Sequence, residues 1–184
     1  MRSMRPKDCI MNKSLIAKLA LLALAAGAGT AHADLVTSSF KVKIAITKIC
    51  AVTTAPTDID LGSAAATATA VSMSGSTTFK VNCSKSTPFF IGLAPSNAST
   101  VGAGLMSGTG GNTDKVPYTL YSNAAMTTVW GNTATTTTVG NGMSGTGAGM
   151  AVGKEVSFTA WAKATNIDFT PDNYIDTVTV NVNY

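Results

Sequence analysis

The sequence predicts an all-β protein built as a β-sandwich, and three observations support this prediction. Residues 174–184 alternate between apolar and polar side chains, which is the period-two pattern of a half-buried strand. Short runs of the same kind recur along the chain between clusters of Gly, Asn and Ser, which favour turns. No helical periodicity follows Ala33. Many short strands separated by turns are typical of two packed sheets.

The expected strands follow one another at regular spacing. They are residues 40–47, 59–62, 77–83, 88–93, 116–121, 156–162 and 174–184. Residues 102–111 are rich in Gly and are expected to form a loop, and residues 133–150 form a Thr- and Gly-rich tract with little to bury. Within 156–162 the alternation places Phe158 on one face of its strand and Trp161 on the other.

The first 33 residues have the pattern of a secretory signal peptide. Five basic residues precede the apolar run 19–26, and Ala31-His32-Ala33 ends the segment. The apolar run is shorter than the roughly 20 residues that a membrane-spanning helix needs. We therefore expect export, with cleavage after Ala33 and with either Met1 or Met11 as the start.

Removal of this segment leaves a nearly neutral chain, because residues 34–184 contain eight Lys, no Arg and eight acidic residues. The sequence pI of about 9.0 thus reflects the leader. A surface without excess positive charge gives no basis for binding nucleic acid.

Two cysteines remain after cleavage, Cys50 and Cys83, which lie 33 positions apart. An even number of cysteines in an exported protein predicts a disulfide. Two buried free thiols are the alternative. We expect no metal site, because His32, the one histidine of the chain, leaves with the signal peptide. No cofactor is expected either.

Several ordered motifs resemble the spore coat protein U domain, which also forms the pilin subunits of archaic chaperone–usher pili. The motifs are Cys50-Ala51-Val52, Ile59-Asp60-Leu61-Gly62, residues 78–83, Tyr118-Thr119-Leu120-Tyr121, Trp130-Gly131 and residues 174–180. The resemblance covers residues 40–184. It implies an incomplete immunoglobulin-like sandwich that is completed by donor-strand exchange. It also implies three kinds of partner, namely identical or related pilin subunits, a periplasmic chaperone and an outer-membrane usher.

Two alternating segments fit this scheme as a donor and as an acceptor. The expected donor side chains are Phe40, Val42, Ile44 and Ile46, and those of the acceptor-groove edge strand are Val178, Val180, Val182 and Tyr184. The expected organisation is therefore a signal peptide (1–33), a donor strand with its hinge (34–49) and a pilin domain (50–184). The alternative is that residues 40–47 form the first internal strand of the domain.

The sequence favours a pilus subunit that serves attachment and biofilm formation over three alternative functions. An enzyme is disfavoured because the mature chain has no His and a single Glu, Glu155, and a turn explains Asp58 and Asp60. A small-molecule substrate is not expected. A sugar-binding sandwich would need exposed aromatic side chains, whereas aromatic residues in strands more often lie in the core. A secreted coat protein outside any pilus is the remaining alternative.

Overall fold

The computed structural model describes residues 34–66 and 72–184, so the expected signal peptide lies outside the described residues. The described residues form nine strands and no helix. The strands are β1 (Cys50–Thr54), β2 (Met73–Cys83), β3 (Pro88–Pro95), β4 (Ala103–Gly108), β5 (Lys115–Tyr121), β6 (Met143–Thr146), β7 (Val156–Ala164), β8 (Tyr174–Ile175) and β9 (Val178–Asn183). The all-β prediction is therefore confirmed.

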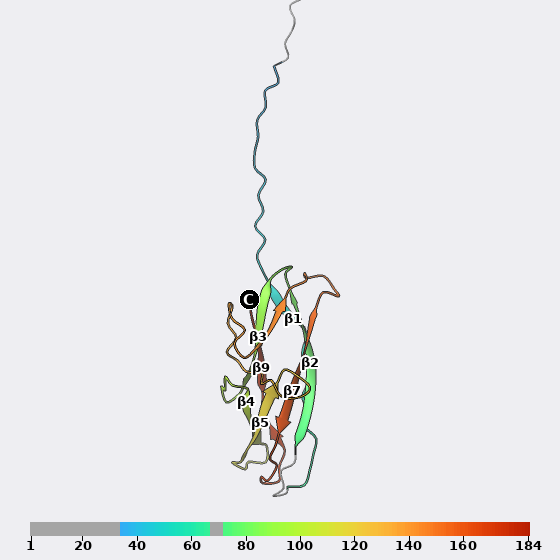
Figure 1. Ribbon diagram of the computed structural model, residues 1–184, viewed down its shortest axis with the longest axis vertical. Helices are drawn as coiled ribbons and strands as arrows, with labels where there is room; N and C mark the ends of the chain where they lie inside the picture. The colour runs from blue at the N-terminus through green and yellow to red at the C-terminus, as the bar shows by residue number, and fades with distance from the viewer. Residues whose placement is uncertain (1–33, 67–71) are drawn as a thin grey trace, which may run out of the picture. The chain divides into compact units, whose positions relative to one another are not determined.

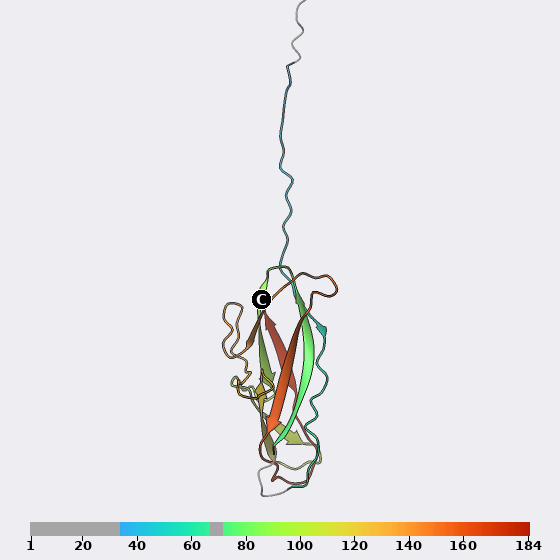
Figure 2. The ribbon, with the colours of Figure 1, turned by 45° about the vertical axis from the view of Figure 1, so that its right-hand side comes forward.

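Two antiparallel sheets make up the body of the domain. One sheet has six strands in the order β1-β2-β7-β5-β4-β8, and the other has three in the order β6-β3-β9. Long neighbouring strands β2 and β7 run side by side along the body (Figure 1). The turned view places β7 and β9 in different layers, in agreement with their membership of different sheets (Figure 2).

The core lies between the sheets and is organised around aromatic side chains. Phe79 of β2 and Phe158 of β7 stack with their ring centroids 5.9 Å apart. Trp130 packs against both rings and donates a hydrogen bond from Nε1 to the Ile91 carbonyl oxygen at 2.9 Å. As expected from the alternation, Phe158 is buried while Trp161 is only half-buried.

One strand assignment and one loop assignment from the sequence are wrong. Residues 59–62 form a turn without a strand, in which Asp60 Oδ1 accepts a hydrogen bond from the Gly62 amide at 2.7 Å. Gly62 has a φ of +86°, a conformation that suits glycine. Residues 102–111, expected as a loop, contain strand β4. A Cβ at Gly104 would overlap the Tyr118 ring, so this glycine marks close packing inside a strand.

The prediction of one continuous strand over residues 174–184 is also wrong, because the structure has two strands there. Strand β8 pairs with β4 in the larger sheet, whereas β9 pairs with β3 in the smaller one. The chain changes sheets at Asp176 and Thr177, where Asp176 Oδ1 accepts a hydrogen bond from the Thr177 amide at 2.7 Å. Residues 133–150 likewise contain a strand, β6, which pairs with β3.

Residues 34–44 belong to a unit separate from the body, which comprises residues 45–184. The structure assigns no strand to residues 34–49, and the first strand of the described chain begins at Cys50. Phe40, Val42 and Ile44 are each 87–88% exposed. An extended segment without a strand partner thus presents apolar side chains at every second position.

Among the described residues, no helix has the length and apolar character needed to span a membrane.

Candidate functional site

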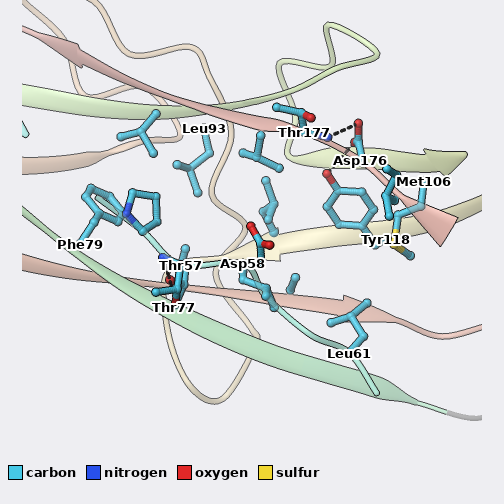
Figure 3. A pocket seen from close by; sticks show the side chains of 18 of the residues that line it. Thr57, Asp58, Leu61, Thr77, Phe79, Leu93, Met106, Tyr118, Asp176 and Thr177 are labelled. Carbon is cyan, nitrogen blue, oxygen red and sulfur yellow. Dashed lines mark hydrogen bonds between the residues drawn. The ribbon is translucent and has the colours of Figure 1, made fainter. Parts of the chain in front are cut away.

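An apolar cavity of about 540 Å³ lies between the two sheets. Its lining includes core side chains of the larger sheet, side chains of β9 and the stretch 56–61 that follows β1. We call this cavity the groove, and Figure 3 shows it from close by. The apolar side chains at its base include Phe79, Leu93, Leu120, Ala160 and Ala162.

Strand β9 forms one wall of the groove and is an edge strand of its sheet. It pairs with β3 from Val178, opposite Pro95, to Asn183, opposite Phe90. No described strand pairs with its other side. The side chains expected to line an acceptor edge are half-buried and pack against the core. These are Val178, Val180, Val182 and Tyr184.

The opposite wall is the stretch 56–61, which is not a strand. It is attached to β2, because the Thr57 amide donates a hydrogen bond to Thr77 Oγ1 at 3.0 Å. Ile59 and Leu61 are partly buried against the core. Asp58 lies between the two walls in Figure 3 and is exposed to solvent.

A buried hydroxyl and a carboxylate close one end of the groove. The Tyr118 hydroxyl donates a hydrogen bond to Asp176 Oδ2 at 2.7 Å. Burial raises the pKa of Tyr118 far above its usual value, and the hydrogen bond and negative charge of Asp176 raise it further. Neither residue is predicted from the sequence to line a groove. The one signal for Asp176 is its polar side chain where residues 174–184 were expected to continue as a strand.

We expect the change Tyr118→Phe to lower the stability of the protein by about 1.5–3 kcal/mol near neutral pH, because a hydrogen bond to a charged group is lost. The raised pKa of Tyr118 stabilises the folded state below the unfolded-state pKa of about 10, and this contribution decreases as the pH rises above that value. The difference between the two proteins should therefore shrink from pH 8 to pH 11. Urea unfolding followed by circular dichroism measures it, and a difference that stays constant would contradict this account.

The chain enters the body outside the groove lining, next to the C-terminal end of β9. The Ile49 amide donates to Ser84 Oγ at 3.0 Å, and the Ser84 amide donates to the Ile49 carbonyl at 2.9 Å. Lys48 Nζ lies 5.9 Å from the centroid of the Tyr184 ring, within the range of a cation–π contact. Residues 48–49 are therefore held beside the C-terminal end of β9.

Cys50 and Cys83 form a disulfide, which confirms the pairing expected from the sequence. They are opposite each other in the antiparallel pair β1–β2, with Cα atoms 4.1 Å apart. The cross-link joins the start of β1 to the end of β2. It therefore encloses the chain segment that carries the groove wall 56–61.

The structure does not bring the residues considered for sugar binding or metal binding together as a site. Trp130 is 1% exposed and Tyr118 is 6% exposed, so neither offers a free face to a sugar ring. Trp161 and Tyr121 are half-buried neighbours on β7 and β5. Across residues 34–66 and 72–184, no group of three or more His, Cys, Asp or Glu side chains is arranged to hold a metal ion.

The fold and the groove define a two-sheet all-β domain in which the free edge of β9 lies beside an apolar cavity. The sequence matches the Spore Coat Protein U domain family over residues 36–181, and the chain belongs to this family. The resemblance noted in the sequence is thereby confirmed.

The chain is also similar to a solved structure described as the chaperone–tip adhesion subunit pre-assembly complex CsuC–CsuE from archaic chaperone-usher Csu pili of Acinetobacter baumannii. The two chains are 19% identical, with a TM-score of 0.49. The match covers 76% of this chain and 40% of that chain, so this chain spans less than half the length of its structural neighbour. No curated protein matches the sequence.

Proposed function

We propose that this chain is a structural subunit of an extracellular pilus and that it polymerises by donor-strand exchange. The observation that supports this most directly is the free edge of β9 beside the apolar groove. The proposed donor is the segment 36–46 of a neighbouring copy. In this scheme the chain is exported, a periplasmic chaperone protects its groove, and an outer-membrane usher exchanges the chaperone for the next subunit. Surface attachment and biofilm formation are the proposed roles of the fibre.

The donor and the groove have complementary chemistry. Free sheet edges bind added strands through main-chain hydrogen bonds, while alternate side chains fill pockets. Four apolar side chains of the segment 36–46 share one face of an extended strand, and each is exposed in the described chain. Their burial in the groove would contribute roughly 6–12 kcal/mol before ordering costs. The donor side chains are Phe40, Val42, Ile44 and Ile46.

The position of the chain entry favours donation between copies over self-insertion. Every strand pair of the described sheets is antiparallel, and we expect the donor to pair with β9 in the same way. Antiparallel pairing places Ile46 near Val178, about 20 Å along β9 from Tyr184. Lys48 of the same chain lies beside Tyr184, and Ile46 is two residue steps before Lys48, which span at most about 7 Å. The antiparallel donor must therefore come from another copy.

A rearranged chain tests this proposal. Residues 36–46 are moved from the N terminus to follow Tyr184 through a turn of about four residues, so that they can return along β9 as a hairpin. The rearranged chain should be a monomer that unfolds cooperatively, because its groove is filled from within. The mature chain in its natural order should form oligomers or aggregate at the same concentration. Sedimentation velocity distinguishes these outcomes.

A matched control carries the same 36–46 residues in shuffled order after Tyr184, which removes the alternation but keeps the composition. We expect this control to aggregate like the natural chain. A shuffled chain as stable and as monomeric as the rearranged one would contradict strand donation, as would a natural chain that is a sharp monomer at every concentration. The last result would favour a secreted coat protein that is not part of a pilus.

A further inference from the structure

The groove contains two carboxylates in an otherwise mostly apolar lining, and only one of them is already hydrogen-bonded. Asp176 accepts hydrogen bonds from the Tyr118 hydroxyl and from the Thr177 amide. Asp58 also lines the groove, yet no hydrogen bond or ion pair involves its carboxylate among the described residues. No Lys belongs to the lining of the groove. Within residues 34–66 and 72–184, Asp58 is therefore a carboxylate without a partner at the place where a strand is proposed to bind.

The proposed donor segment has the opposite charge. Residues 34–49 contain Lys41, Lys43 and Lys48 and a single acidic residue, Asp34. Lys41 and Lys43 alternate with the apolar side chains, so in an extended strand they share the face that points away from the core. We propose that Asp58 forms an ion pair with Lys43 of the incoming donor strand and thereby selects the donor and its register. This inference rests on the proposed function.

The level of Asp58 along the groove identifies Lys43 as the nearer lysine. Of the apolar residues on β9, Val178 and Val180 line the groove together with Asp58, and Val182 and Tyr184 do not. If the donor is antiparallel and its four apolar residues face the four of β9, then Ile46 and Ile44 lie at this level. Ala45 lies between them on the outer face, and Lys43 is the next outer residue. Lys41 lies one further step toward the Tyr184 end.

This arrangement has a physical consequence for register. A slip of the donor by two residues keeps its apolar face in the groove, because side chains alternate with a period of two. Apolar packing alone therefore discriminates only weakly between registers that differ by two residues. A charge pair across the groove mouth favours the register in which Lys43 reaches Asp58. Complementary charges also increase the rate of association, an effect that salt reduces.

A charge exchange in the full mature chain tests the inference, with assembly followed by light scattering at about 20 mM and about 500 mM NaCl. The single changes Asp58→Lys and Lys43→Asp should each slow assembly by about two- to tenfold at low salt, and by less at high salt. The chain that carries both changes restores an opposite-charge pair and should recover most of the rate. Lys41→Asp is the positional control and should have the smaller effect.

The variant Ile44→Gln, measured in the same assay, separates the two proposals. If it blocks assembly while both single charge changes assemble at the wild-type rate, strand donation stands and the ion pair is refuted. The ion pair is also refuted if the doubly changed chain is slower than either single variant, or if Lys41→Asp has the larger effect. If Ile44→Gln assembles normally, strand donation itself is refuted.

Discussion

The change Ile44→Gln should abolish assembly at concentrations where the unchanged protein assembles completely. Under the proposed function, Ile44 lies in the dry groove of the neighbouring copy. The change loses the burial of an isoleucine, worth about 1.5–3 kcal/mol, and leaves a buried amide without partners, at a cost of about 1–3 kcal/mol. Together these terms weaken each contact between subunits by roughly 10²- to 10⁴-fold. Electron microscopy of fibres and size-exclusion chromatography of the purified chain measure the effect.

The adjacent change Ala45→Gln is the matched control. Ala45 lies on the opposite face of an extended donor strand, so the same new side chain would point into solvent. Assembly of this variant should be close to normal. Equal loss of assembly in both variants would show that the segment does not bind as an alternating strand. Normal fibres in both would show that residues 40–47 are not the donor.

The sequence predicts the core strands well because their alternation is undisturbed. Strand β7 shows this most clearly, since the face predicted from Phe158 is the buried one. Alternation depends on burial on one face only, and both sheets of this domain have one face on the core. The disulfide is predictable for a separate reason, because an exported chain with two cysteines has one possible pairing.

The errors have a common cause, which is that local composition does not report tertiary contacts. Gly104 and its neighbours have the composition of a loop, but Gly104 is required by the Tyr118 ring that packs on it. Asp176, where the chain changes sheets, accepts a hydrogen bond from Tyr118, which is 58 positions away in the chain. The alternation of apolar and polar residues along the sequence does not predict either contact.

The groove was predictable only in part. The alternation of β9 predicts one wall, and the structure places its apolar side chains against the core. The other wall, residues 56–61, was expected to contain a strand at 59–62 and instead forms a turn held by Asp60. The sequence predicts that Asp58 is part of a turn. Its position at the groove mouth follows from the attachment of Thr57 to Thr77, which no local pattern indicates.

Loss of the disulfide should have the second large effect, and it should act on the groove as well as on stability. The loop from Cys50 to Cys83 spans 33 positions, and the chain-entropy account assigns about 3.5–4 kcal/mol to its closure. This is a large part of the 5–15 kcal/mol that stabilises a typical domain. The double change Cys50→Ser and Cys83→Ser in the rearranged monomer should lower the urea midpoint by roughly 1–3 M.

The location of the cross-link adds a second expectation. It encloses the wall 56–61 and lies next to residues 48–49, where the chain enters the body. Without it, the wall is held to β2 mainly by the Thr57–Thr77 hydrogen bonds and by the pairing of β1 with β2, so hydrogen exchange should accelerate in residues 50–62 more than in β7. Reduction of the rearranged monomer that keeps both cysteines should reproduce both effects, whereas the reductant should not affect the double variant. A variant with an unchanged urea midpoint and unchanged exchange in residues 50–62 would show that the strand pairing alone holds the groove wall.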